Sequence, residues 1–395
     1  MSYSIGTIED LASIEMGQSP KGDTVRRSPT GLPLLNGPTE FGQQHPVPAQ
    51  WTDSGVRFAR AGDVLFCVRG STTGRMNRAD QDYAIGRGIA ALRARDGVDS
   101  RIVKYALDAS LSDLLAGVSG SVFPNLSRDQ ILRHRVPVPP RAEQQAIVEV
   151  LGALDDKIAA NNALAATAEQ LLRTEMDAVW LRSHDRSSTL SDLVELNPKV
   201  AVPRTESAVY VDMKRLPESG WSVDGFDYCE PKGGARFRNG DTLLARITPC
   251  LENRKTGFVD QLPEGEIGVG STEFIVLRAR DGIAPPISFL LATATRFRDH
   301  AIQHMIGTSG RQRVAASDLA SFELPTPDPD WLTDFGSRAV AVFDLVASQN
   351  AENRTLAATR DALLPQLMSG KLRVRDAENA VSEAGHAAHV VGGDR

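Results

Sequence analysis

The stretch EQQAIVEVLGALDDKIAANNALAATAEQLLRTEMDAVW runs from Glu143 to Trp180 and contains no proline and no glycine after Gly152. Apolar or small residues recur along it in alternating steps of three and four, which is the spacing of a coiled-coil seam. Asn161 and Glu175 interrupt this seam, and a buried asparagine there costs stability but selects the register. The stretch therefore predicts one long helix of about 40 residues, or about 60 Å at 1.5 Å per residue.

A segment near the C-terminal end has the same character, again with an asparagine in mid-seam. Two such helices in one chain can pair with each other, and they run antiparallel if a two-fold axis relates the two halves. A spacer between domains or a homodimer zipper would produce a similar first helix, but a zipper needs only one helix per chain. The predicted seam residues are Ile147, Leu151, Leu154, Ile158, Asn161 and Leu172 in the first helix, and Phe343, Val346, Asn350 and Leu364 in the second.

Four sequence motifs occur twice, in the same order, in the two halves of the chain. The order and the long period indicate a tandem domain duplication rather than a solenoid. The pairs are GDVLFCVRGSTTGR (62–75) with GDTLLARITPCLENR (240–254), ALRARDG (91–97) with VLRARDG (276–282), SGSVFPNLSRDQILRHRVPVPP (119–140) with SGRQRVAASDLASFELPTPDP (309–329), and NNALAATAEQLL (161–172) with ENRTLAATRDALL (352–364).

Each half reads as a mixed α/β domain followed by a long helix. The GD motifs begin strands rich in Val, Leu, Ile and Phe, and the ALRAR and VLRAR motifs continue the strand pattern. Segments 99–120 and 285–310 have helical spacing and end at glycine. We expect a first domain (1–139), a first helix (140–182), a second domain (183–328) and a second helix (329–375). The tail (376–395) is polar and rich in glycine and alanine, and we expect it to be disordered.

Composition restricts the class of protein. Cys67, Cys229 and Cys250 lie far apart with no CxxC spacing, which favours a reducing cytoplasm. The chain has neither a long uninterrupted apolar run nor a signal-peptide pattern, so we expect no membrane association. Its net charge is −6 and no segment is strongly basic. If DNA is the partner, local arginine-rich loops or another subunit must supply the phosphate contacts.

Three motifs carry a resemblance to a known family. They are GQSP (17–20), PVPPRAEQQAIVEVLGALDDKIAANN (137–162) and LAATRDALLPQLMSGKLRV (356–374). With them the chain resembles, over nearly its whole length, the specificity (S) subunit of type I restriction-modification systems. The second domain boundary, TPDPDWLTDFGSRAV (326–340), departs from the family pattern because it lacks the proline-and-EQ motif seen at 140–144.

The resemblance implies two target-recognition domains, each of which reads one half of a bipartite, asymmetric site in double-stranded DNA. It also implies that the helices set the spacing of the domains and dock methyltransferase subunits, of which two are expected. The assembled complex would methylate adenine at N6 with S-adenosylmethionine, and motor-nuclease subunits would cleave unmethylated DNA with ATP and magnesium. The S subunit itself would bind no cofactor and perform no chemistry.

Motifs for chemistry are missing from the sequence. NPKV (197–200) has only the first two letters of the Asn-Pro-Pro-aromatic turn that adenine methyltransferases need. GSTTGR (70–75) lacks the spacing and the lysine of a P-loop. EPK (230–232) is the nearest approach to a nuclease motif and lies among glycines, and the histidines show no metal-ligand spacing. These absences favour a binding subunit.

Base reading needs Arg, Lys, Asn, Gln, Ser or Thr on loops that reach the major groove. Such residues cluster after the GD strand in each half, at the same place but with different letters, as two different half-sites would require. Solvated surface is the simpler interpretation for any one of them. The candidates are Gln18, Lys21, Arg69, Ser71, Thr72, Arg75 and Arg78 in the first half, with the loop 119–128, and Lys199, Arg246, Thr248, Asn253, Arg254, Lys255, Arg311, Gln312 and Arg313 in the second.

Three alternatives remain at this point. The chain can be the recognition subunit of a related methyltransferase-based defence system that lacks the motor nuclease, which neighbouring genes would reveal. It can be an adaptor whose two domains bind proteins and not DNA. An enzyme is the third alternative, and the missing methyltransferase motifs argue against it.

Overall fold

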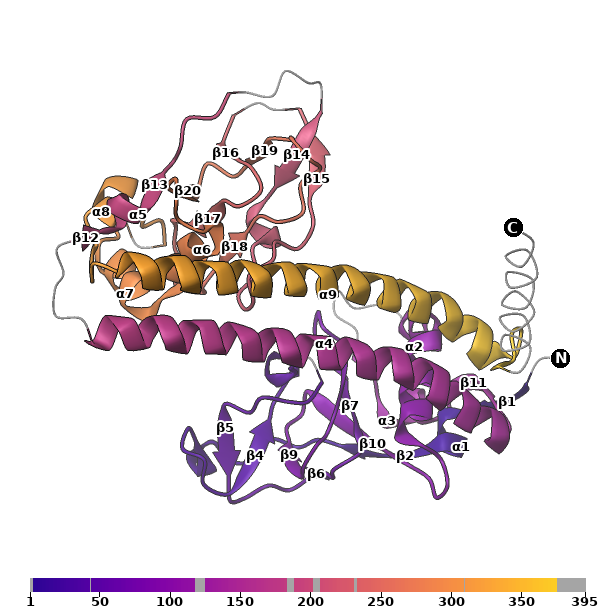
Figure 1. Cartoon of the computed structure of the whole chain (residues 1–395). Coiled ribbons are helices and arrows are strands. Elements are labelled where there is room, and N and C mark those ends of the chain that lie inside the picture. The colour runs from indigo at the N-terminus through magenta and orange to yellow at the C-terminus, as the bar shows by residue number, and fades with distance from the viewer. Residues whose placement is uncertain are drawn as a thin grey trace, which may run out of the picture. The chain divides into compact units, whose positions relative to one another are not determined.

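The computed structural model describes residues 3–42, 44–117, 125–182, 188–201, 207–230, 233–308 and 310–374. The chain divides into two compact units, which we call the first unit (Met1–Ala160 with Asn353–Arg395) and the second unit (Asn161–Glu352). The two long helices are α4 (Arg141–Arg182) and α9 (Pro329–Ser369) (Figure 1). Each unit therefore contains one half of each long helix. The predicted tail, 376–395, lies outside the described residues.

Among its described residues, the first unit combines short strands with three shorter α-helices and two 3-10 turns. Its helical elements are α1 (Ile8–Leu11), α2 (Ser100–Ala116), α3 (Arg128–Leu132), η1 (Gly22–Thr24) and η2 (Pro38–Glu40). Its strands are β1 (Ser4–Thr7), β2 (Ala12–Met16), β3 (Val25–Arg26), β4 (Leu32–Leu35), β5 (Gln50–Thr52), β6 (Phe58–Ala59), β7 (Val64–Cys67), β8 (Met76–Arg78), β9 (Tyr83–Ile85), β10 (Ile89–Ala94) and β11 (Arg135–Val138).

The second unit is built from similar elements. Its helical elements are α5 (Leu190–Leu193), α6 (Pro285–Thr293), α7 (Thr295–Gln303), α8 (Ala316–Ala320) and η3 (Met213–Arg215). Its strands are β12 (Ser188–Thr189), β13 (Val194–Leu196), β14 (Ala208–Val211), β15 (Asp227–Cys229), β16 (Ala235–Phe237), β17 (Thr242–Ala245), β18 (Thr256–Phe258), β19 (Gly268–Gly270), β20 (Phe274–Ala279) and β21 (Glu323–Leu324).

The sheets of the two units correspond, as the sequence duplication predicts, except that the second sheet has five strands (β3-β5-β4-β9-β6) in the first unit and four (β15-β14-β19-β16) in the second. An antiparallel four-stranded sheet runs β2-β10-β7-β8 in the first unit and β13-β20-β17-β18 in the second. A second sheet contains one parallel pair, β4 with β9 and β14 with β19. Two-stranded pairs, β1-β11 and β12-β21, complete the match. The predicted mixed α/β fold with two domains and two long helices is confirmed.

The four-stranded sheet of each unit is buried on both faces. In β7, Val64 and Phe66 belong to the core shared with α2 and the long helices, whereas Leu65 faces the core shared with the second sheet. In β20, Ile275 and Phe274 divide in the same way. This alternation follows from the two-residue period of a strand, and it explains why these strands read as continuous apolar runs.

The repeated GD and RAR motifs form the same ion pair, between an arginine and a buried aspartate, in both units. Asp63 accepts hydrogen bonds from Arg93 at 2.7 and 3.1 Å, and Asp241 accepts them from Arg278 at 2.6 and 2.7 Å. Each aspartate also accepts from a backbone N–H three residues earlier, at 2.8 and 2.9 Å. The preceding glycine has a positive φ, 90° for Gly62, which closes this tight turn.

One further repeat escapes the sequence comparison because it is short. TIEDL (7–11) and TLSDL (189–193) both form a capping box in which the aspartate accepts from the backbone N–H of the threonine, at 2.7 Å in both. The threonine-to-aspartate spacing of three is the signal that identifies it.

The segment 285–310 is not one helix, as its spacing predicts, but two. α6 ends at Thr293, and Ala294 has extended backbone angles before α7 begins at Thr295. This change of direction buries Phe297 completely against the core of the second unit. Burial of an aromatic side chain outweighs the loss of a few helical hydrogen bonds.

In the second unit the two long helices run antiparallel. Asn161 of α4 donates to Glu352 of α9 at 2.8 Å. Further along α4, Glu175 accepts from Arg338, which comes earlier in α9, at 2.5 and 2.6 Å. The buried Asn161 thus meets a carboxylate of the other long helix. Asn350, which the seam pattern places between the helices, donates instead to Ser222 of the domain at 3.0 Å.

The helices pack on their domain as well as on each other. Phe343 is stacked on Trp221, with ring centroids 4.2 Å apart, and meets Phe258 and Phe289 edge-on. Of the predicted seam residues, those buried are Ile147, Leu151, Asn161, Leu172, Phe343, Val346 and Leu364, and those half-buried are Leu154, Ile158 and Asn350.

The helix halves of the first unit are antiparallel too. Arg360 of α9 donates to Asp155 of α4 at 2.9 Å, and Asp155 also accepts from Tyr105 of α2 at 2.8 Å. Nearer the end of the pair, Tyr3 donates to Glu143 at 3.4 Å and lies against Gly370. The first-unit core joins α2, α4 and α9 in one cluster.

Candidate nucleic-acid interface

Most candidate residues of the first unit lie at one end of its four-stranded sheet, in loops that follow the last residues of strands. β10 runs antiparallel to both of its neighbours, so the ends of β2 and β7 lie beside the start of β10. Gly17 donates to the carbonyl of Ile89 at 2.9 Å, and Val68 donates to that of Gly88 at 2.9 Å. The loops 17–21 and 68–75 therefore leave the sheet at the same end of its strands. They carry Gln18, Lys21, Arg69, Ser71, Thr72 and Arg75.

The second unit repeats this construction with different residues. β20 lies between β13 and β17 and is antiparallel to both. The loop that carries Lys199 and the loop 246–255 therefore leave the sheet at the same end of its strands. The segment 310–314 joins them, because Thr248 donates to the carbonyl of Gln312 at 3.1 Å and Val314 donates to that of Arg246 at 3.0 Å. Two loops that are far apart in sequence thus form one surface.

Most of these side chains are accessible. The exposed candidates are Gln18, Lys21, Arg69, Ser71, Arg75 and Arg78 in the first unit and Lys199, Asn253, Arg254, Arg311 and Arg313 in the second. The half-buried candidates are Thr72, Arg246, Thr248, Lys255 and Gln312.

Not every candidate joins its group. Arg78 lies opposite Val64 at the start of β7, so it is at the other end of the sheet from the loop 68–75. Lys255 donates to the carbonyl of Leu216 at 3.1 Å and lies 3.8 Å from Glu218, which ties it to its own domain. In the loop 119–128, residues 119–124 lie outside the described part of the chain, as does Ser309 in the second unit.

The described end of the loop 119–128 has a defined place. Asn125 forms a bridge with Arg69, and Leu126 donates to the carbonyl of Val68 at 3.0 Å. The bridge between Arg313 and Ile247 is its counterpart in the second unit. The structure thus brings the second candidate segment of each half against the loop that follows the GD strand.

A carboxylate that the sequence comparison missed lies in the second-unit surface. Glu273, directly before β20, accepts from Arg313 through Nε at 2.8 and 3.0 Å and through Nη2 at 2.7 Å. These hydrogen bonds, and after them the charges of Arg313 and Arg246, hold the pKa of Glu273 below its usual value despite partial burial. Nothing near Glu273 in the sequence indicates this partner, because Arg313 lies 40 residues away.

Two polar atoms of this surface are buried without a hydrogen-bond partner among the described residues. They are Nε of Arg246 and Oγ1 of Thr248. A buried donor or acceptor that stays unpaired costs about 1–3 kcal/mol. Such atoms are common where a protein surface is completed by another molecule or by water.

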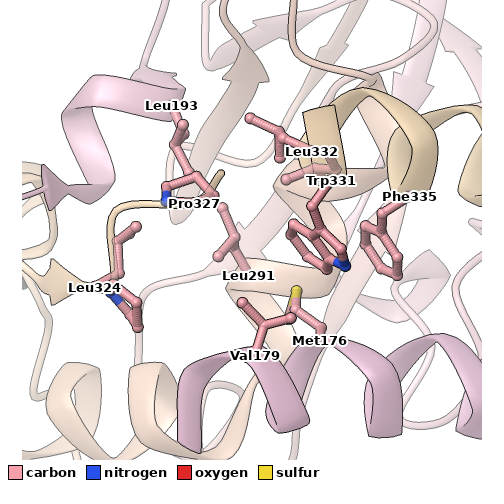
Figure 2. A pocket seen from close by; sticks show the side chains of 11 residues that line it. Met176, Val179, Leu193, Leu291, Leu324, Pro327, Trp331, Leu332 and Phe335 are labelled. Carbon is pink, nitrogen blue, oxygen red and sulfur yellow. The ribbon is translucent and has the colours of Figure 1, made fainter. Parts of the chain in front are cut away.

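A cavity elsewhere in the second unit does not share these properties. It has a volume of about 20 Å³ and an apolar lining, in which Trp331 stacks on Phe335 with ring centroids 4.7 Å apart (Figure 2). A gap of this kind is a packing defect where helix ends meet their domain, not a ligand site. The lining residues are Met176, Val179, Leu193, Ile287, Leu291, Leu324, Pro325, Pro327, Trp331, Leu332 and Phe335.

Neither metal sites nor membrane spans are found in the described ranges. No three His, Cys, Asp or Glu side chains there are grouped so that they could hold a metal ion. No helix there combines the length and apolar character needed to cross a bilayer.

Comparison with known proteins shows which proteins the chain resembles. A family model described as the type I restriction modification DNA specificity domain matches residues 2–170. The matched residues lie in the first half of the chain. The putative type I restriction enzyme MjaX specificity subunit of Methanocaldococcus jannaschii is 32% identical over 151 residues, which are 38% of this chain and 35% of that relative. This match thus spans about a third of the relative's length.

Longer but weaker matches cover both halves. The MjaVIII specificity subunit from the same organism is 18% identical over 341 residues, 80% of each chain. The crystal structure of a type I restriction-modification S subunit from M. genitalium superposes with a TM-score of 0.57 at 16% identity, covering 93% of this chain and 96% of that one. The family resemblance and the two-domain fold predicted from the sequence are confirmed.

Proposed function

We propose that this chain is the DNA-specificity subunit of a type I restriction-modification complex and that each unit reads one half of a bipartite DNA site. One observation carries this proposal. Each unit has its own four-stranded sheet with the same strand order, and polar loops leave the corresponding end of each sheet. The side chains on these loops differ between the units. A duplicated scaffold with divergent loops suits a target made of two different half-sites.

The chemistry of the loops suits recognition of base edges. Arginine pairs with guanine through two hydrogen bonds, asparagine and glutamine pair with adenine, and serine and threonine bind either. Arg69 and Arg75 in the first unit, and Arg246 and Arg254 in the second, are the principal candidates. Contacts to phosphates would orient the protein without reading sequence.

The partners and the reaction follow from the family and are part of the proposal. The net charge of −6 leaves little general attraction to DNA. Methyltransferase subunits, two in number, would supply further DNA contacts, bind S-adenosylmethionine and methylate adenine at N6. Motor-nuclease subunits with ATP and magnesium would add cleavage. This chain would bind none of these cofactors and would act in the cytoplasm, where chromosomal DNA lies.

The test is to map methylated bases in the host genome after exchange of the gene for variants. Arg69→Ala with Arg75→Ala should alter one half-site, and Arg246→Ala with Arg254→Ala should alter the other, with about 1–3 kcal/mol lost for each base contact. Arg78→Ala is the control, because that side chain lies at the opposite end of the sheet.

Two results would contradict the proposal. If removal of the whole gene leaves every methylated motif in place, the chain is not a specificity subunit. If both double variants alter the same half-site, the assignment of one unit to each half is wrong.

A further inference from the structure

The arginine of the second-unit surface that is held most firmly is Arg313. Its guanidinium meets the Glu273 carboxylate along the edge formed by Nε and Nη2, with distances of 2.7–3.0 Å. Glu273 is fixed in turn, because its backbone carbonyl accepts from the N–H of Arg246 at 3.0 Å. An ion pair with two parallel contacts defines the plane and direction of a guanidinium as a single contact cannot.

The pairing leaves part of the guanidinium available. Arginine has five N–H donors. Glu273 takes that of Nε and one of Nη2, and the carbonyl of Arg311 lies 3.4 Å from Nη1. Within the described part of the chain, one N–H on each terminal nitrogen has no further hydrogen-bond partner, and the edge between these two nitrogens adjoins the edge that binds Glu273. Arg313 is 41% exposed, so this edge can be reached from outside.

The arrangement is particular to the second unit. The β7–β10 and β17–β20 registers place Gly88 of the first unit where the second has Glu273, since Cys67 pairs with Ile89 and Ala245 with Phe274. A glycine has no side chain with which to orient an arginine. The first unit must therefore use a different device.

We propose that Arg313 reads a guanine in the half-site of the second unit and that Glu273 is the positioning residue that aims it. Two N–H groups on one guanidinium edge match O6 and N7 of guanine in the major groove. This inference rests on the proposed function and adds to it one base, one reading residue and the residue that orients it.

The carboxylate also decides what kind of contact Arg313 makes. An arginine without a partner is attracted to any phosphate, whereas an arginine paired with glutamate has little net charge and adds little to binding of unrelated DNA. Its fixed orientation reduces the side-chain entropy lost when the base is bound. Glu273 thus shifts the contribution of Arg313 from affinity to selectivity.

The experiment compares three single variants with the unchanged chain in the host, each expressed from the native locus. Methylated bases are mapped across the genome, and the methylated fraction is compared between sites that differ at one base pair. Arg313→Lys keeps the charge but not the paired donors, and Glu273→Gln keeps the shape but not the charge. Glu175→Gln removes the carboxylate of a similar ion pair, with Arg338 on the long helices, and is the matched control.

We expect Arg313→Lys to reduce preference for one guanine by about 5- to 150-fold, the equivalent of a lost two-bond contact. Glu273→Gln should relax the same position by a smaller factor, while the fraction methylated at sites with the other three bases there rises. A role of Glu273 in folding alone would lower methylation at all sites equally. Glu175→Gln should leave preference at every position unchanged.

Three results would overturn the inference. In the first, Arg313→Lys leaves the motif unchanged or relaxes a position without guanine. In the second, Glu273→Gln relaxes a position different from that of Arg313→Lys. In the third, Glu273→Gln lowers methylation uniformly. All three leave two half-sites intact and so differ from failure of the proposed function, in which deletion of the gene changes no methylated motif.

Discussion

Substitution of the buried aspartate in the two GD turns should cost different amounts in the two units, although the motif is the same. Asp241 is 1% exposed and its partner Arg278 is 16% exposed, whereas Asp63 is 3% exposed and its partner Arg93 is 37% exposed. The perturbation is Asp241→Asn in one variant and Asp63→Asn in another. Each keeps the volume of the side chain but replaces a charged acceptor with an amide.

The magnitude follows from what happens to the arginine. Arg278 has little access to water, and a buried charge that loses its partner costs about 3–5 kcal/mol. Arg93 can turn toward solvent, so Asp63→Asn should cost only the hydrogen bonds to a charged group, about 1.5–3 kcal/mol. The second-unit variant should therefore be less stable than the first-unit variant by about 2 kcal/mol.

The chain contains two compact units, so one melting temperature would not report on either unit alone. Hydrogen–deuterium exchange with mass spectrometry, followed across a urea series, measures the opening free energy of peptides from β10 and β20 in each variant. As a control, Asp241→Leu with Arg278→Met removes both charges and should recover much of the loss. Equal losses at the two sites, or a larger loss for Asp63→Asn, would refute the argument from exposure.

Three further outcomes follow from the structure and composition. Phe343→Ala should destabilise the second unit by about 3–5 kcal/mol in urea unfolding, while Leu345→Ala, 48% exposed on the same helix, should stay within about 0.5 kcal/mol. Hydrogen bonds from Arg338 lower the pKa of Glu175, so this pair stabilises above the unfolded value of about 4.3 and is lost as pH falls through the lower folded value; Glu175→Gln should flatten that acid dependence. The isolated chain should bind DNA weakly in gel shifts and tightly once methyltransferase is added; equal specific binding without it would contradict this.

The sequence predicts the fold well because its strongest signals are periodic and repeated. The long helices, the duplicated α/β domain and the strands after each GD motif need only local pattern and internal comparison. The break at Ala294 was not predictable in this way, because it depends on where Phe297 finds a buried place. The pairing of Asn350 with Ser222 depends likewise on tertiary contacts.

The candidate site, like the fold, is predictable where it depends on local sequence pattern and not where it depends on tertiary contacts. The loop after the GD strand is found from sequence because polar residues follow a buried strand in both halves. The sequence does not show that Arg78 lies apart from the other candidates. The register of β8 places it opposite Val64, at the other end of the sheet from the loop 68–75. Glu273 is found only when segments 246–255 and 310–314 are seen together, because nothing near it in sequence indicates that Arg313 is its partner.

The repeat in the sequence and the compact unit in space are not the same piece of chain. The sequence repeats a domain followed by its helix, but each unit takes one half of that helix and one half of the other. Leu364 and Leu367, from the end of the second repeat, complete the first-unit core together with Ile147 and Leu151. Because apolar area from both repeats is buried in one core, each domain is stabilised by residues of the other repeat. Duplication has thus produced two domains that can differ in their loops while each depends on both helices for its fold.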